Sequence, residues 1–131
     1  MLRFSLLAGC LLLTACSGSD ESATESGAVP EMPRFAEEAL AKGRGIWMGT
    51  CRNCHLLGIS GAPAVNDYAA WEPRIVKERS LLYRSALNGI KGEDGQYRMP
   101  PRGGNPQLKD EQVRLAVDYM LASVRQLTGE R

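Results

Sequence analysis

Two long stretches of the chain carry apolar residues at steps of three and four positions, which is the spacing of one face of an α-helix. The first predicts a helix over residues 33–48, with an apolar face formed by Ala36, Ala39, Leu40, Gly43, Ile46 and Trp47. The second predicts a helix over residues 110–126, with a stripe formed by Val113, Ala116, Val117, Met120, Leu121 and Val124. Asp110 and Glu111 suit the positive amino-terminal end of this second helix.

Shorter helices are predicted between these two. Ser80 is placed to cap a helix that continues to Leu87, where an Asn-Gly pair would end it. The helix before it is expected to begin near Pro73 and to include Ile75 and Val76. No stretch shows the alternation of a strand, and no segment repeats. The folded part of the chain is therefore predicted to be all-α.

The first 15 residues have the pattern of a signal peptide. Arg3 supplies a positive charge, and the apolar run after it is too short to span a bilayer comfortably. The run ends in Leu13-Thr14-Ala15-Cys16, which resembles a bacterial lipobox, so Cys16 is expected to carry lipid. Ordinary cleavage nearby, with Cys16 left as a free thiol, is the alternative. Ser17 follows Cys16 where an inner-membrane retention signal would typically place aspartate, which slightly favours the outer membrane.

Residues 16–33 have almost nothing to bury. They are rich in Ser, Gly, Glu and Ala, and they predict a flexible acidic tether before a folded domain at residues 34–131. The chain has 16 basic and 15 acidic residues, a formal net charge of +1. Because the tether holds four of the acids and the signal peptide one of the bases, the domain alone carries +4. The whole-chain charge predicts binding to neither nucleic acid nor a charged membrane surface.

Two cysteines remain for the folded domain, because Cys10 belongs to the signal peptide and Cys16 to the lipidation site. They are Cys51 and Cys54 of Cys-Arg-Asn-Cys-His, followed directly by His55, the one histidine of the chain. A zinc site needs about four ligands, and no second cluster completes this set. A thioredoxin-like dithiol needs a preceding strand, whereas a helix is predicted here, so that alternative is poorly supported. Cys-x-x-Cys-His is instead the attachment pattern of a c-type haem.

A c-type haem accounts for each position of this motif. Thioether bonds from Cys51 and Cys54 would hold one porphyrin edge, and His55 would bind the iron from one side. Because the chain has no second histidine, the sixth ligand is expected to be a methionine. Met99 lies in a polar stretch before two prolines that stiffen the backbone, and we assign it as the distal ligand. The other methionines of the mature chain lie in the tether, beside the motif or in a packed helix face: Met32, Met48 and Met120.

Around these residues the chain resembles a class I cytochrome c, and more narrowly the small bacterial cytochrome c5 type. The matching stretches span about residues 36–124 in the family's order: CRNCH, GISGAPAVND, AAWEPRI, LLYRSALNGIKG, MPPRGGNP and DEQVRLAVDYM. The resemblance implies an all-α fold of four to five helices wrapped around one covalently bound haem c, with single-electron transfer as the activity. It also implies that the first and last helices cross at Gly43, Trp47 and Tyr119.

Further contacts follow from the same resemblance. Pro63 is expected to offer its carbonyl to Nδ1 of His55. Candidate donors to the haem propionates are Trp71, Arg74, Tyr97 and Arg102, and a packing or surface role is equally open to each of them. The chain departs from the family in two respects. It has no second cysteine pair for a disulfide, and the stretch GEDGQYR at residues 92–98 is longer and more polar than in the shortest members.

The sequence therefore predicts a membrane-tethered electron carrier of the bacterial cell envelope. We expect a periplasmic monomer, anchored by lipid at Cys16, that docks transiently with redox proteins at its haem edge. A small haem peroxidase is one alternative, although no second histidine exists to serve as a distal acid or base. A haem sensor, or a subunit docked permanently in a larger redox complex, is the other.

Overall fold

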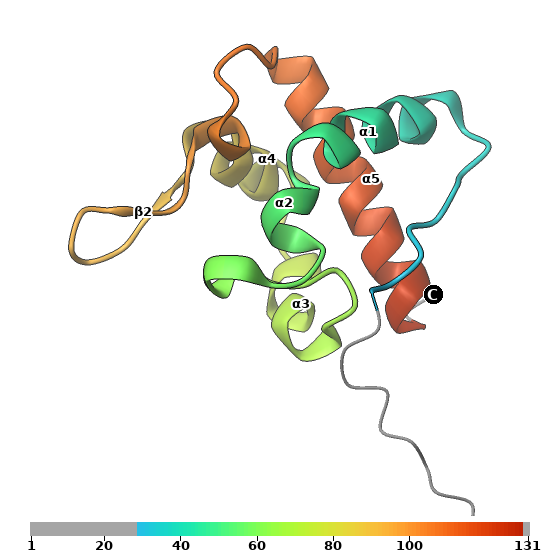
Figure 1. The fold of residues 1–131 in the computed structure, drawn as a ribbon, viewed down its shortest axis with the longest axis horizontal. Coiled ribbons are helices and arrows are strands. Elements are labelled where there is room, and N and C mark those ends of the chain that lie inside the picture. Colours follow the sequence, from blue (N-terminus) through green and yellow to red (C-terminus); the bar gives the residue numbers. More distant parts are fainter. Residues whose placement is uncertain (1–28, 130–131) are drawn as a thin grey trace, which may run out of the picture.

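Two crossed helices, α1 (Glu38–Gly49) and α5 (Asp110–Thr128), form the centre of the fold (Figure 1). The computed structural model describes residues 29–129, so the predicted signal peptide, Cys16 and most of the predicted tether lie outside the described residues. The elements between the two helices are α2 (Arg52–His55), η1 (Ile59–Gly61), α3 (Tyr68–Ile75), α4 (Arg79–Asn88), β1 (Ile90–Lys91), β2 (Tyr97–Met99) and η2 (Pro101–Gly104). The predicted helical class is confirmed.

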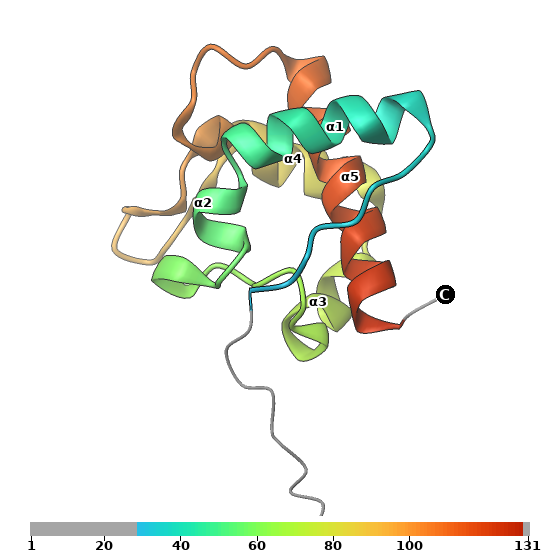
Figure 2. The ribbon, with the colours of Figure 1, turned by 45° about the vertical axis from the view of Figure 1, so that its right-hand side comes forward.

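The crossing of α1 and α5 occurs at Gly43, as the resemblance implied (Figure 2). A Cβ atom added at Gly43 would lie 2.8 Å from the carbonyl carbon of Leu115 and 3.0 Å from Cβ of Tyr119. The absence of a side chain lets the two backbones approach closely. Trp47 and Tyr119 are fully buried beside the crossing, with ring centroids 5.8 Å apart. This contact determines where the end of α1, and the cysteine motif after it, lies relative to α5.

The apolar stripe predicted for α5 is confirmed, since all six of its residues are buried. The helix continues two residues beyond its predicted end, and Gly129 closes it with φ 74°, a left-handed conformation that glycine adopts without strain. Within residues 29–129, no helix has both the length and the hydropathy needed to cross a membrane.

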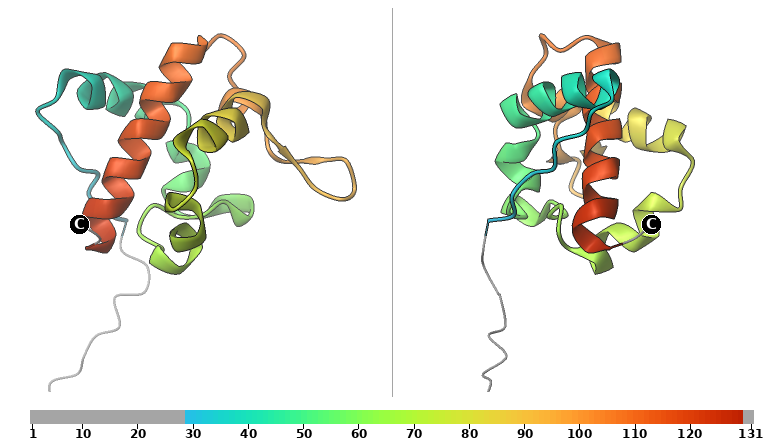
Figure 3. Two further views of the ribbon diagram at one scale, coloured as in Figure 1. Left: turned by 180° about the vertical axis from the view of Figure 1, so that it is seen from behind. Right: turned by 90° about the vertical axis from the view of Figure 1, so that its right-hand side faces the viewer.

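The segment before α1 is extended and packed, where the sequence predicted a tether followed directly by helix. α1 begins at Glu38 instead of residue 33. Met32, which was assigned to the tether, is only 6% exposed and belongs to the core. The Tyr119 hydroxyl donates a 2.9 Å hydrogen bond to the carbonyl of Pro33. The Phe35 ring also packs edge-on against Tyr119 with ring centroids 5.9 Å apart, so this segment runs beside α5 (Figure 3).

The start predicted for α3 was wrong. The helix begins at Tyr68, because the Asp67 carboxylate accepts a 3.1 Å hydrogen bond from the N–H of Ala70 and caps the first turn. Pro73 therefore lies inside the helix rather than at its start, and Val76 is the cap residue after its end. Aspartate is a preferred N-cap residue, so Asp67 was the sequence signal for the start of this helix, and Pro73 was not.

The end predicted for α4 is correct and its start is not. The helix ends at Asn88, and Gly89 follows with φ 74°. It begins at Arg79, so Ser80 lies within the first turn and caps nothing. Ala86 is the buried residue of this helix, and it faces the cavity described below.

A small antiparallel hairpin, β1 and β2, was not predicted. Ile90 pairs with Met99 and Lys91 with Tyr97, with an irregularity between the two pairs. These strands of two and three residues are too short to show a readable alternation. The hairpin projects from the helices (Figure 1) and places Met99 at the end of a paired strand rather than in a free loop.

Candidate functional site

The Cys51–His55 motif begins two residues after α1 ends at Gly49, with Cys51 as the N-cap of α2 and His55 as its last residue. The backbone N–H of His55 donates a 3.0 Å hydrogen bond to the carbonyl of Cys51. Cys51 and Cys54 are both half-buried and are not joined by a disulfide. Residues three apart in a helical turn lie on the same face, so the two thiols can bond to one edge of a single group.

The imidazole of His55 is 7% exposed and is fixed by the backbone of residues 63–65. Its Nδ1 lies 3.0 Å from the Pro63 carbonyl oxygen, and the N–H of Val65 donates a 2.9 Å hydrogen bond to the His55 carbonyl. Because a carbonyl only accepts, Nδ1 carries the proton and Nε2 keeps its lone pair for a metal. Burial lowers the pKa of His55, opposed by the Pro63 hydrogen bond and reinforced by the charge of Arg74. The ring is therefore neutral at pH 7, the form that binds metals.

Trp71 packs behind the same backbone segment. It is 3% exposed, its ring centroid is 6.2 Å from that of His55, and its indole N–H donates a 2.7 Å hydrogen bond to the carbonyl of Ala64. In this structure the N–H that was expected to reach a haem propionate is used within the chain. Nothing in the sequence marks Ala64 for this contact, because a backbone carbonyl leaves no signal in residue type.

The other residues considered for a propionate have varied surroundings. Arg74 donates to the carbonyl of Ala70 in its own helix. Tyr97 is 49% exposed on β2. Arg102 lines the cavity described next and donates to the chain that follows it. None of these contacts was predicted from the sequence.

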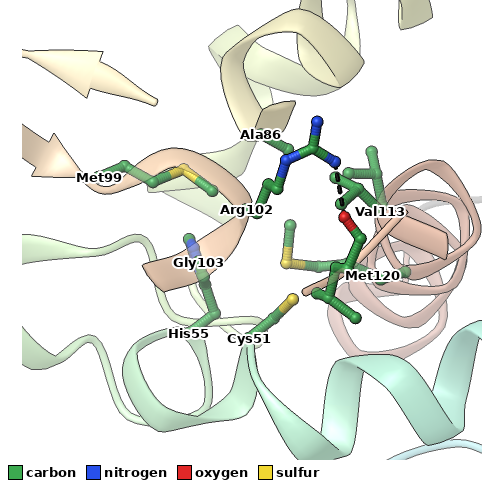
Figure 4. Close-up of a pocket in the computed structure, with 11 residues that line it drawn as sticks. Cys51, His55, Ala86, Met99, Arg102, Gly103, Val113 and Met120 are labelled. Carbon is green, nitrogen blue, oxygen red and sulfur yellow. Dashed lines mark hydrogen bonds between the residues drawn. The ribbon is translucent and has the colours of Figure 1, made fainter. Parts of the chain in front are cut away.

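An apolar cavity lies between α2, α4, α5 and the segment after β2 (Figure 4). Part of it is open to solvent. Its apolar wall is mainly Ala86 of α4 with Val113, Ala116 and Val117 of α5. The fold brings Cys51, His55 and Met99 to this one cavity, whereas Cys54, Pro63 and Trp71 lie outside its lining.

Two methionines contribute to the cavity wall. Met99 enters from the end of β2, and Met120 enters from α5 on the side of Cys51 (Figure 4). Met120 is 7% exposed and belongs to the packed stripe, as predicted, but it also faces the cavity. The helical period of α5 indicated that Met120 is buried and could not indicate which cavity it meets.

The chemistry of the donor set separates a haem from a free metal ion. Burial raises the pKa of the Cys51 thiol to about 11, a backbone hydrogen bond lowers it, and Cys54 adds a smaller upward effect. The thiol is therefore protonated at neutral pH. Among residues 29–129, no three His, Cys, Asp or Glu side chains are grouped to hold a metal ion. An apolar cavity with one neutral imidazole, two thioether sulfurs and an adjacent thiol pair fits haem c.

The chain is similar to proteins of a known family. The model of a family described as "Cytochrome C oxidase, cbb3-type, subunit III" matches residues 38–120. Cytochrome c-555 of Chlorobaculum thiosulfatiphilum is 43% identical over 81 residues, which cover 62% of this chain and 92% of that protein. The chain belongs to the class I cytochrome c family. Its place near the c5 type, expected from the resemblance, is also confirmed.

Further relatives agree with this assignment. Cytochrome c5 of Ectopseudomonas mendocina is 32% identical over 89 residues, covering 66% of this chain and 87% of that protein. A cytochrome c in a crystal structure of an electron transfer complex with nitrite reductase aligns with a TM-score of 0.55 at 33% identity, covering 64% of this chain and 95% of that one. As a class I cytochrome c, the protein has one covalently attached haem c and the attachment spacing at Cys51 and Cys54. It is an electron carrier and not an enzyme, which removes the peroxidase alternative.

Proposed function

We propose that this cytochrome carries single electrons between redox proteins of the bacterial cell envelope, with His55 and Met99 as its axial iron ligands. The observation that carries the proposal is the shared cavity: Cys51 and His55 of the motif and the distant Met99 of β2 line the same space. When bound there, haem c supplies a one-electron couple at its iron, and a methionine ligand raises its reduction potential.

In this proposal, His55, Met99 and the cavity residues of α5 have distinct roles. His55 keeps Nε2 free for the iron, because the Pro63 carbonyl holds the proton on Nδ1. Met99 fills the sixth position and so denies small molecules access to the metal. The α5 residues Val113, Ala116 and Val117 exclude water from one side of the porphyrin. Two protein ligands on a rigid backbone limit the rearrangement that accompanies each electron.

Exposed apolar side chains near the motif support transient docking at the haem edge. Leu57 is 55% exposed and Ile59 is 51% exposed, both shortly after His55. Arg52 of the motif is also exposed, and a small apolar patch with a cationic rim is suited to brief contact with an acidic surface. The structural neighbour is itself a cytochrome c seen in an electron transfer complex. Short-lived complexes of this kind suit a carrier that must dissociate after each transfer.

Absorption spectroscopy of the matured protein tests the ligand assignment. We expect a c-type spectrum when reduced, a near-infrared methionine–iron charge-transfer band when oxidised, and no change on addition of carbon monoxide. Both axial positions are then occupied by protein. Rapid carbon monoxide binding without that band would mean that the iron has an open position, and the carrier with His55 and Met99 ligation would be wrong.

We further propose that lipid on Cys16 anchors the protein to a membrane facing the periplasm, and that residues 17–28 span the distance to the domain. The support is the lipobox-like sequence, since these residues precede the described part of the chain. In cells, Cys16→Ser is expected to move the holoprotein from the membrane fraction to the soluble periplasmic fraction. The variant lacks the acyl chains, whose insertion contributes about 0.8 kcal/mol of membrane binding per buried CH₂. Ser17→Ala is the matched control and should stay with the membrane. Retention of the Cys16→Ser protein in the membrane, with its leader removed and no partner bound, would exclude the lipid anchor.

One observation favours a second candidate, a subunit docked permanently in a larger complex. The matching family model is described as a subunit of a cbb3-type oxidase. The two candidates predict different states of the Cys16→Ser protein. A mobile carrier is released alone, whereas a docked subunit remains with a stoichiometric partner.

A further inference from the structure

Arg102 has a backbone conformation that its residue type disfavours. Its φ of 55° and ψ of 27° are left-handed, and Gly103 and Gly104 continue in the same region with φ of 64° and 84°. Glycine adopts this conformation freely, but a residue with a Cβ atom is strained there. Among residues 29–129 the only other non-glycine residue with positive φ is Ser60. The strain at Arg102 is compensated by contacts that its side chain makes.

The guanidinium of Arg102 joins the segment after Met99 to the start of α5. Nη1 donates a 2.7 Å hydrogen bond to the carbonyl of Leu108 (Figure 4). Nη2 donates a 2.6 Å hydrogen bond to Oδ1 of Asp110. The Arg102 side chain is 28% exposed, far less than Arg98 at 66%. Asp110 is the first residue of α5, the helix whose residues line the cavity. Both hydrogen bonds therefore reach across to the fixed wall of the haem site.

The same segment is packed on its other sides against glycine and Thr50. A Cβ atom at Gly89 would lie 2.6 Å from the Met99 carbonyl oxygen and 2.8 Å from the nitrogen of Pro101. A Cβ atom at Gly103 would lie 2.9 Å from Cγ2 of Thr50. These contacts oppose movement toward the helices but do not prevent movement away from them. Pairing with Ile90 of β1 holds Met99 on the hairpin side, and the guanidinium adds the side-chain link from this segment to α5.

We propose that Arg102 is a positioning residue for Met99: its two hydrogen bonds hold residues 99–104 against α5 and so keep the Met99 thioether at the iron. This inference rests on the proposed ligation by Met99. It assigns Arg102 a partner within the chain, Asp110, in place of a haem propionate. Residues that orient a metal ligand from behind commonly change metal binding by about 10- to 100-fold when they are removed.

The experiment follows the near-infrared methionine–iron band of the oxidised holoprotein in denaturant, with far-ultraviolet circular dichroism reporting global unfolding. Arg102→Asn removes the positive charge, and asparagine tolerates the left-handed backbone conformation. Arg102→Lys keeps the charge but lacks the bidentate hydrogen-bond donor of the guanidinium. Asp110→Asn removes the partner charge. In each variant we expect the population without Met99 ligation to rise about tenfold before global unfolding. The double variant Arg102→Asn with Asp110→Asn should be no worse than Arg102→Asn alone, because the two residues act through one contact.

Two matched controls separate this role from general effects of charge. Glu111→Gln removes the other acid of the first α5 turn, and with it the same favourable interaction with the helix dipole. Arg98→Lys alters another Arg–Asp pair, Arg98–Asp94, which is exposed and adjacent to Met99 in the chain. Both controls should keep the band as wild type does. If Asp110→Asn behaves like Glu111→Gln while the Arg102 variants lose the band, Arg102 acts through its charge or a propionate and the inference is overturned.

Hydrogen exchange distinguishes failure of this inference from failure of the proposed ligation. The N–H groups of Gly103 and Asn105 donate to the carbonyls of Pro100 and Arg102, so their exchange reports the order of this segment. Faster exchange in the Arg102 and Asp110 variants, and not in the controls, supports the contact; unchanged exchange overturns it. If the wild-type protein lacks the band, the Met99 ligation is wrong. The positioning role then fails with it, even where exchange shows that the contact exists.

Discussion

Met99→Leu is expected to abolish the near-infrared methionine–iron band and to let the reduced protein bind carbon monoxide. Leucine is close to methionine in volume, so the cavity wall is conserved while the sulfur is lost. Because a thioether ligand favours Fe(II), the reduction potential should fall by about 0.1 V or more, a part of the roughly 0.8 V over which axial ligands set haem potentials. Spectroelectrochemical titration of wild type and variant measures this change.

Met120→Leu is the matched control, because Met120 lines the same cavity from α5. It should keep the band and the potential, and cost less than about 1.5 kcal/mol of stability. If the band is instead lost in Met120→Leu and retained in Met99→Leu, the distal ligand is Met120 of α5. If both variants keep the band, neither methionine is the distal ligand.

Gly43→Ala is expected to lower the free energy of unfolding by about 1 to 3 kcal/mol, although alanine is the better helix former. The added Cβ atom would lie 2.8 Å from the carbonyl carbon of Leu115, and closer still to its oxygen. Backbone atoms inside α5 cannot turn aside as a side chain can, so α1 must move away from α5. This movement also displaces the cysteine motif that follows α1. Denaturant unfolding of the holoprotein, followed by circular dichroism, measures the loss.

Gly45→Ala provides the control in the same helix. A Cβ atom at Gly45 meets no other atom within 4 Å, and the residue is exposed. This variant should be stabilised by about 0.5 to 1 kcal/mol through helix propensity alone. Equal stabilities for the two alanine variants would contradict the close approach at Gly43.

The helical framework was predictable because its signals are local and repeated. The stripe on α5 runs over three turns, and each of its six residues is buried. The attachment motif could be recognised without knowledge of the fold, because Cys51, Cys54 and His55 lie within about one helical turn. The boundaries that depend on a single residue were less secure. Asp67 overrode Pro73 at the start of α3, and contacts with α5 kept residues 32–35 out of helix.

The sequence by itself determined the helical class, the attachment motif and a short set of methionines from which an iron ligand could come. The tertiary structure decided what those residues meet. It brought Met99 and Met120 to one cavity, turned the Trp71 N–H to the carbonyl of Ala64, and directed Arg102 to Asp110. The reason is physical: residue type and spacing describe contacts within one helical turn, whereas these contacts join residues more than one turn apart or use backbone carbonyls common to every residue.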